Sequence, residues 1–408
     1  MQLALIHGQL LSLLTASAVA SIFAKSPGYD ARRLLGGADV MLESLISSFT
    51  ATPAALLGAY PSLPLPFSTT RSQAAEALRK AVAFSKAAFG VLASGGAVVA
   101  IANSMAVRSS SSSSSHNHHH PTTQHHQLQQ WDILLILNFL KSNASLKRAE
   151  TFTPICLPTY NPNGHLHAYI SFLDAPTSTA VVLLTGGPSP EFKILSEAQR
   201  ELVKELEGCR ALKAIKKAAE ETSSICIGTS SSSSSSTPTD SVPPPPQPYP
   251  ITYTNKSIGL ESLEEALQGA GLGASCVLHC VYKKTPWQQY VMSPWAPAMQ
   301  HETEVHRDVI VAYSQIRAAM FDHGGEHAQG FAPLQTLRYE SRPRFSLVAL
   351  SSPVTELYLA MDPLVGKAEA VRAGGEVLRL LGTRHDELFF SSSDSYDSSF
   401  GLFKNLYL

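Results

Sequence analysis

The chain has few cysteines, and their spacing matches neither a disulfide framework nor a metal site. The five are Cys156, Cys209, Cys226, Cys276 and Cys280. An odd and scattered set of this kind excludes a small secreted domain stapled by disulfides. We therefore expect a protein of the reducing cytosol.

An excess of charge of one sign is also missing. The formal net charge is −1, the sequence pI is about 6.9, and no basic patch stands out. This balance gives no electrostatic reason to expect nucleic acid or an anionic membrane as the main partner. In contrast, 408 residues that are 44% hydrophobic supply enough apolar material for the cores of two or three domains.

No stretch reaches the roughly 18 to 20 consecutive apolar residues that a membrane-spanning helix needs. The nearest candidate is residues 3–24, where Ala18-Val19-Ala20 is similar to a signal-peptide cleavage site. No Lys or Arg precedes this stretch and polar residues interrupt it, so we favour an amphipathic helix over a signal peptide. The stripe expected to face the protein consists of Leu3, Ile6, Leu10, Leu13 and Leu14.

The sequence contains no G-x-S-x-G elbow, G-x-G-x-x-G fingerprint or P-loop. Thr185-Gly186-Gly187-Pro188 lies between a predicted strand and a predicted helix, but it lacks the lysine of a phosphate loop and is interpreted as a turn. We therefore expect no cofactor and no covalent catalysis.

Histidines offer the only other candidate chemistry. Residues 116–126 form a His-rich tract that could bind a metal adventitiously, and His165 and His167 lie two apart without a third ligand. His279 lies between Cys276 and Cys280, for which buried strand residues are the simpler interpretation. A metalloenzyme built on the histidines is thus the weakest functional hypothesis.

The order of predicted elements occurs twice, over residues 88–207 and 276–381. Each copy consists of an apolar hairpin, a helix, three strands and an amphipathic helix. In the first copy these are 89–102, 131–141, 153–157, 165–173, 180–184 and a helix that starts at Ser189-Pro190. In the second copy they are 276–292, 304–321, 334–340, 345–350, 356–361 and a helix that starts at Asp362-Pro363. Each Ser or Asp is expected to cap its helix, with Pro at the first helical position.

Apolar periodicity predicts which helices are covered on one face and which on two. Residues 192–206 and 305–320 each carry one apolar stripe at helical spacing. Ile133 to Leu140 is apolar almost all round, so this helix should be buried between a sheet and something else. Residues 1–60 predict two helices, 3–23 and 38–49, and no strand, so these helices must dock on another part of the chain.

These elements predict an α/β (α+β) protein of tandem domains, each a five-stranded antiparallel sheet flanked by helices. Residues 1–60 would be the C-terminal helical half of a first domain, 61–210 a second domain and 256–391 a third. A Ser-, His- and Gln-rich insert at about 108–130, a linker over 211–255 and a tail over 392–408 have compositions typical of disorder.

Several strings resemble the vacuolar fusion proteins of the Mon-one family, in the same order and over nearly the whole chain outside the serine-rich inserts. They include residues 29–37, 63–65, 152–161, 356–364 and 386–389, among them Phe152-Thr153-Pro154-Ile155-Cys156-Leu157-Pro158 and Glu356-Leu357-Tyr358. The resemblance implies three longin domains, of which the first begins here at its helices.

The resemblance also implies a function and partners. Members of this family join a Ccz-one type longin protein as a guanine-nucleotide exchange factor for a Rab-seven class GTPase. They act downstream of a Rab-five class GTPase and are recruited peripherally from the cytoplasm to the late endosome or vacuole. The alternative is a longin scaffold that retains partner binding without exchange activity.

One segment is a candidate for partner binding. Tyr29, Asp30, Arg32 and Arg33 combine an aromatic ring with adjacent charges between two helices that are expected to dock. The alternative interpretation of these four residues is a solvated helix start.

Overall fold

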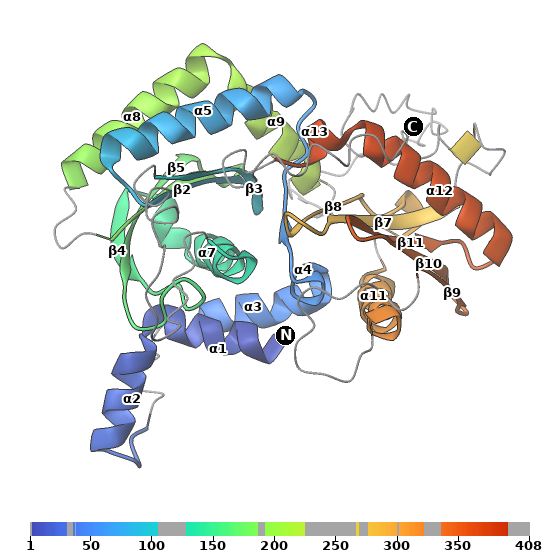
Figure 1. Ribbon diagram of the computed structural model, residues 1–408, viewed down its shortest axis with the longest axis horizontal. Coiled ribbons are helices and arrows are strands. Elements are labelled where there is room, and N and C mark those ends of the chain that lie inside the picture. The colour runs from blue at the N-terminus through green and yellow to red at the C-terminus, as the bar shows by residue number, and fades with distance from the viewer. Residues whose placement is uncertain are drawn as a thin grey trace, which may run out of the picture.

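Two β-sheets stand side by side with helices on both of their faces in the computed structural model (Figure 1). The structure describes residues 2–30, 36, 38–104, 128–186, 192–224, 267–268, 276–299, 302–321 and 336–390. Residues 108–127 of the predicted insert, most of the 211–255 linker and the 392–408 tail lie outside these residues, as does Ser189-Pro190.

The first sheet confirms the first predicted copy. Its strands are β2 (Phe89–Ser94), β3 (Ala97–Asn103), β4 (Thr151–Ile155), β5 (Leu166–Asp174) and β6 (Thr179–Thr185). They are antiparallel neighbours in the order β3-β2-β6-β5-β4. Gly95 and Gly96 join β2 to β3 with positive φ angles of 59° and 80°, which glycine adopts without a steric penalty.

Helices cover both faces of this sheet. On one face lie α5 (Ser68–Ser85), α8 (Phe192–Gly208) and α9 (Ala211–Ser224), whose apolar stripes share one core with the sheet. On the other face lies α7 (Gln130–Ser142), in which every residue from Asp132 to Asn138 is buried. A short 3-10 helix, Ala144–Lys147, follows α7.

The N-terminal helices cover the far side of α7, which confirms that α7 is buried between a sheet and another layer. They are α1 (Gln2–Leu13) and α3 (Asp39–Ala51); α2 (Ala16–Lys25) projects away from the body between them, and α4 (Ala54–Leu57) follows α3. α1 and α3 contact α7, and α3 also contacts α11 (Thr303–Phe321) of the second copy. The predicted single helix over 3–23 is wrong, because the chain bends by 81° between α1 and α2.

The predicted stripe of α1 is also wrong. Leu3 is exposed, and the buried side of the helix carries Leu5, Gln9, Leu11 and Ser12. Polar contacts set this orientation: Asn138 Nδ2 of α7 donates to Gln9 Oε1 at 2.8 Å and to the Met41 carbonyl of α3 at 2.9 Å. A buried amide must find such partners, so it can override an apolar stripe.

The second sheet repeats the first and adds one strand. Its strands are β1 (Tyr60–Pro61), β7 (Val277–Lys284), β8 (Gln289–Met292), β9 (Leu337–Ser341), β10 (Ser346–Ser351) and β11 (Thr355–Met361), in the order β1-β8-β7-β11-β10-β9. α11 covers one face and α12 (Lys367–Thr383) the other. Short helical turns, Pro297–Met299 and α13 (His385–Leu388), complete this copy.

Residues 60–65 join the two sheets. β1 pairs in parallel with β8, and Ser62 forms a bridge with Val98 of β3, so the chain runs between the two sheet edges. Arg71 of α5 is buried beside this segment and donates to the carbonyls of Val99, Leu63 and Glu387. The prediction of no strand within residues 1–60 missed Tyr60, because a two-residue strand leaves no periodic signal.

Two predicted boundaries differ from the structure. α12 begins at Lys367 rather than at Asp362-Pro363: Asp362 Oδ1 accepts instead from the Leu364 amide at 2.9 Å in a tight turn. Residues 211–224 form α9 rather than part of a linker, because Ala211, Leu212 and Ile215 bury an apolar stripe against the first domain.

Candidate partner-binding surfaces

Helix α2 projects from the body of the protein (Figure 1). Thr15 caps it by accepting from the Ala18 amide at 3.2 Å, and the Ala16 amide donates to the Pro162 carbonyl at 2.8 Å. No residue of α2 is buried, and Phe23 is 39% exposed. Helical spacing places Ser17, Ser21 and Lys25 on one side and Ala16, Val19, Ala20 and Phe23 on the other. An apolar helix side left in water is a candidate surface for a partner.

The predicted site segment follows directly after α2. The Tyr29 amide donates to the Ser26 carbonyl at 2.9 Å, which closes a turn at the end of the helix, and the tyrosine side chain is half-buried. Asp30 is exposed, whereas Arg32 and Arg33 lie outside the described residues. The structure thus brings Tyr29 to the base of the projecting helix, and the role of all four residues stays a prediction.

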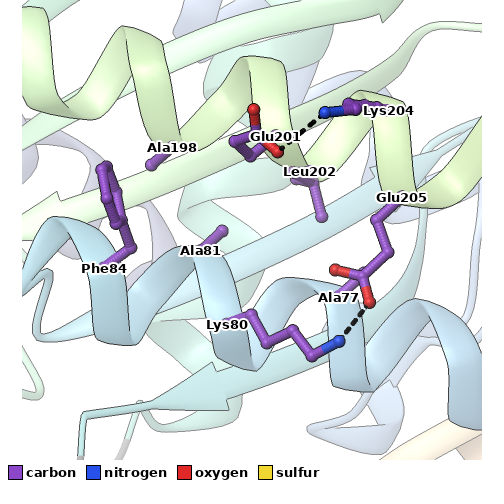
Figure 2. A pocket seen from close by; sticks show the side chains of 9 residues that line it. All are labelled: Ala77, Lys80, Ala81, Phe84, Ala198, Glu201, Leu202, Lys204 and Glu205. Carbon is purple, nitrogen blue, oxygen red and sulfur yellow. Dashed lines mark hydrogen bonds and ion pairs between the residues drawn. The ribbon is translucent and has the colours of Figure 1, made fainter.

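A second candidate surface is a groove of about 450 Å³ between α5 and α8 (Figure 2). Its walls carry Ala77 and Ala81 from α5 and Ala198 and Leu202 from α8, and Phe84 stands at one end, 54% exposed. Lys80 and Glu205 form an ion pair across the groove, and this contact raises the pKa of Lys80. Because these four wall side chains are themselves at most 4% exposed, Phe84 is the main apolar side chain that the groove offers to a partner.

A buried ionic cluster holds the N-terminal helices against the third domain. Glu356 of β11 accepts from Lys283 Nζ at 2.8 Å, from Arg317 Nε at 3.0 Å and from Tyr358 Oη at 2.6 Å. Burial alone would raise the pKa of Glu356, but the two cations outweigh it and lower this pKa to about 2. Lys283 also donates to the carbonyl of Leu57, the last residue of α4, at 2.9 Å. A cation at a helix C-terminus is favourable because it meets unpaired carbonyls.

The predicted buried histidine of the second hairpin belongs to an aromatic stack. The ring of Trp295 lies between those of His279, with centroids 3.9 Å apart, and His306, with centroids 4.0 Å apart. Burial, together with the charge of His306, lowers the pKa of His279 to about 3. His279 is therefore neutral in the physiological range, and its contacts with Trp295 and Tyr313 are those of a core side chain.

The remaining predicted histidines and cysteines occupy ordinary structural positions. His167 on β5 stacks on Phe152 at 5.4 Å, and Cys280 is buried in β7. Within the described ranges, no group of three or more His, Cys, Asp or Glu residues could hold a metal ion. The 116–126 histidine tract falls outside those ranges.

One buried acid has an unsatisfied oxygen. Asp132, in the first turn of α7, accepts from the Thr159 amide through Oδ1 at 3.0 Å, while Oδ2 has no hydrogen-bond partner. Burial raises the pKa of Asp132 to about 6. The Cys156 thiol nearby has a pKa raised to about 11 by burial and by Asp132, so it is not an activated nucleophile.

Comparison with known proteins agrees with this architecture. A family model described as the second longin domain of FUZ, MON1 and HPS1 matches residues 121–204, and one described as their third longin domain matches residues 276–385. The chain is 32% identical over 389 residues to the vacuolar fusion protein MON1 homolog of rice (Oryza sativa subsp. japonica). It is 28% identical over 400 residues to the homolog of Arabidopsis thaliana and 26% identical over 395 residues to human MON1 homolog A.

The chain belongs to the MON1 family. These alignments cover 95 to 97% of the chain but only 60% of the rice protein, 57% of the Arabidopsis protein and 49% of the human protein. The chain therefore spans about half to three fifths of the length of these MON1 relatives.

The second and third longin domains contain all the strands of the two sheets except β1. The second longin domain comprises β2 to β6, although the hairpin of β2 and β3 precedes the matched range 121–204. The third comprises β7 to β11 with α11 and α12. Helices α1 to α4 lie before both matched ranges, and α1, α3 and α4 contact the two domains, which confirms the prediction that the N-terminal helices dock on another part of the chain.

Some residues that fix this arrangement were missed by sequence reasoning. Glu356 stands in the sequence only as part of a string that resembles the family, and no sequence pattern marks Lys283 or Arg71 as buried. A carboxylate at the start of an otherwise apolar predicted strand was the one available clue, because a buried charge requires a partner. Which residue supplies that partner depends on contacts between distant parts of the chain.

No single helix among the described residues is long and apolar enough to cross a membrane. α1 and α2 reach the required composition only as a pair, and the bend of 81° separates them.

Proposed function

We propose that the chain is a subunit of a heterodimeric guanine-nucleotide exchange factor that activates a Rab-seven class GTPase during transport from endosome to vacuole or lysosome. The main support is the similarity of the chain to vacuolar fusion proteins of the MON1 family, combined with two longin domains and an N-terminal helix, α2, that has no buried residue.

The proposed activity needs no covalent catalyst. An exchange factor binds the nucleotide-free GTPase more tightly than the loaded form, so that GDP leaves when the switch region and magnesium site are distorted. Moving such an equilibrium from about 1:99 to 99:1 takes a differential affinity of about 10⁴-fold, or about 5.5 kcal/mol. Contacts between protein surfaces can supply this energy.

The proposed partner is a Ccz-one type longin protein, and α2 with the following Tyr29 is the favoured contact. An apolar helix side with no buried residue would lose its exposed area when it meets a complementary groove. Recruitment to the late endosome or vacuole would then be peripheral, with a Rab-five class GTPase as an upstream contact.

Release of labelled GDP from a Rab-seven class GTPase tests the proposal, using the full chain co-expressed with its Ccz-one type partner. Acceleration relative to the partner alone supports an exchange factor. A stable complex without acceleration supports the alternative of a scaffold, and failure to form any complex contradicts both.

A matched pair of variants tests the role of α2. Phe23→Glu places a carboxylate on the apolar side of the helix, whereas Ser21→Glu places the same group on the polar side. We expect Phe23→Glu to weaken capture of the partner by at least about 10-fold and Ser21→Glu to leave it nearly unchanged, because only the first buries a charge. Equal capture of the two variants would show that α2 is not the contact.

A further inference from the structure

Among the strands that the structure describes, β9 is the last at one end of the two joined sheets, and β4 forms the opposite end (Figure 1). Two hydrogen bonds fix which backbone groups of β9 face outward: Ser351 N to Thr336 O at 2.8 Å and Arg342 N to Phe345 O at 3.0 Å. Antiparallel pairs alternate, so the even-numbered residues of β9 bond to β10. The amides and carbonyls of Leu337, Tyr339 and Ser341 therefore point away from the sheet.

The opposite edge is protected against pairing, whereas the edge of β9 is not. In β4 the outward positions include Pro154, which has no amide hydrogen, and the Cys156 amide beyond the strand donates to the Ser12 carbonyl at 3.0 Å. Proline at an outward position is a common way to block strand addition. Within the described part of the chain, nothing pairs with the outer edge of β9.

The charges along β9 are self-complementary. Arg338 and Glu340 lie on the face covered by α11, where Arg338 Nε contacts Glu340 Oε1 at 3.0 Å and Arg342 contacts Gln315 of α11. If two copies of β9 pair antiparallel about a two-fold axis at Tyr339, Arg338 of one copy stands opposite Glu340 of the other, and the reverse pair forms as well. Opposite charges at such positions stabilise a strand pair and like charges destabilise it.

Tyr339 is the centre of the strand Leu337–Ser341, so this register uses its whole length. The two tyrosines, and each Leu337 with the partner's Ser341, would form the pairs that exchange two backbone hydrogen bonds each. Tyr339 lies on the other face, where its hydroxyl donates to the Val365 carbonyl at 2.8 Å. The neighbouring Leu364 is 91% exposed and offers apolar surface beside the edge.

We propose that two copies of this chain associate through antiparallel pairing of their β9 strands about Tyr339, which extends the third longin domains into one continuous sheet. The interface is isologous, so each surface patch meets its own copy. A five-residue edge buries less area than a standard interface, so we expect association at micromolar rather than nanomolar concentrations. The proposal does not depend on the exchange activity or on α2.

Sedimentation of the full chain at about 1 to 100 μM measures this association. We expect the wild type to dimerise in this range. Arg338→Glu and Glu340→Arg, each of which creates two like-charged pairs, should each weaken the dimer by at least about 10-fold. A mixture of the two variants should dimerise again, because the new Glu at 338 of one variant then meets the new Arg at 340 of the other, and the native Glu340 of the first meets the native Arg338 of the second. The double variant should do so alone.

Arg344→Glu is the matched control, since it makes the same charge change in the adjoining turn, where Arg344 contacts Glu302 and Asp308. It should leave the dimer intact, and thermal melting should show that all variants are folded. Ser341→Pro, which removes an outward amide hydrogen without touching a bond to β10, should also prevent pairing. A wild type that stays monomeric at 100 μM, or single variants that dimerise as well as the wild type, would overturn the proposal.

Discussion

Replacing Glu356 by Gln tests whether the buried ionic cluster stabilises the fold. The side chain of Glu356 is 3% exposed and is the only carboxylate that contacts the buried cations Lys283 and Arg317 among the described residues. The fall of its pKa from 4.5 to about 2 corresponds to about 3 kcal/mol of stability at neutral pH. Breaking a buried pair by removing one partner costs about 3 to 5 kcal/mol, because the other charge is left uncompensated.

The pH dependence of this effect has a definite sign. The folded-state pKa of Glu356 is lower than its unfolded value, so its contribution is complete above about pH 4.5 and disappears as the pH falls toward 2. Urea unfolding of the full chain should therefore give a difference of about 3 to 5 kcal/mol between wild type and Glu356→Gln at pH 7, and a smaller difference at pH 3.

A second readout locates the effect. The amide of Tyr60 donates to the Gln288 carbonyl at 2.9 Å, and Lys283 holds the end of α4 just before it. Hydrogen exchange at Tyr60 should become faster in Glu356→Gln, because α4 and β1 lose part of their anchorage. Glu302→Gln is the control: the Glu302–Arg344 pair is exposed and should contribute no more than about 1 kcal/mol. A loss below about 1 kcal/mol at pH 7, or one that is equal at pH 7 and pH 3, would refute the reasoning.

Three further substitutions have effects that urea unfolding can measure. Asp132→Asn should stabilise the protein at pH 7 by up to about 3 kcal/mol, because the folded-state pKa of about 6 makes the buried carboxylate unfavourable above that pH. The Asn side-chain oxygen can still accept from the Thr159 amide, and a destabilised variant would contradict this prediction. The folded-state pKa of His279 is lowered to about 3, so the wild type loses stability as the pH falls from 6.5 toward 3. His279→Gln should reduce this loss, and an unchanged dependence of stability on pH would argue against the prediction. Asn138→Leu should cost about 1 to 3 kcal/mol, because it leaves the buried Gln9 Oε1 without its donor, and no loss would mean that this hydrogen bond does not orient α1.

Local periodicity predicted the helices whose burial depends only on which of their faces are apolar. The stripe of residues 305–320 is buried as expected, and so is that of residues 192–206 except Phe192, which is exposed. The segment Ile133 to Leu140 of α7, apolar almost all round, is covered on both sides. These predictions succeeded because burial on one face, or on two, leaves its period in the sequence.

The elements that periodicity missed depend on partners that are distant in the sequence. The orientation of α1 follows from Asn138, more than a hundred residues away, and β1 exists because β8 offers it a parallel edge. The role of Tyr29, Asp30, Arg32 and Arg33 could not be tested in the same way, since a surface site shows itself only through its partner. The sequence therefore predicted the order of strands and helices in each sheet better than the contacts between distant elements.

The junction between the domains determines whether a partner that binds at α2 could move one domain relative to the other. Residues 57–65 are held from both sides: Lys283 and Gln289 of the third domain hold Leu57 and Tyr60, and Arg71 of the second domain holds Leu63. The same arginine also binds the Glu387 carbonyl of α13, and Ser62 donates to the Leu388 carbonyl. A movement of α3 and α4 relative to α7 must therefore break buried polar contacts with two domains at once. Because such contacts are expensive to leave unmade, a partner bound at the N-terminal helices should meet one rigid unit rather than a hinged one.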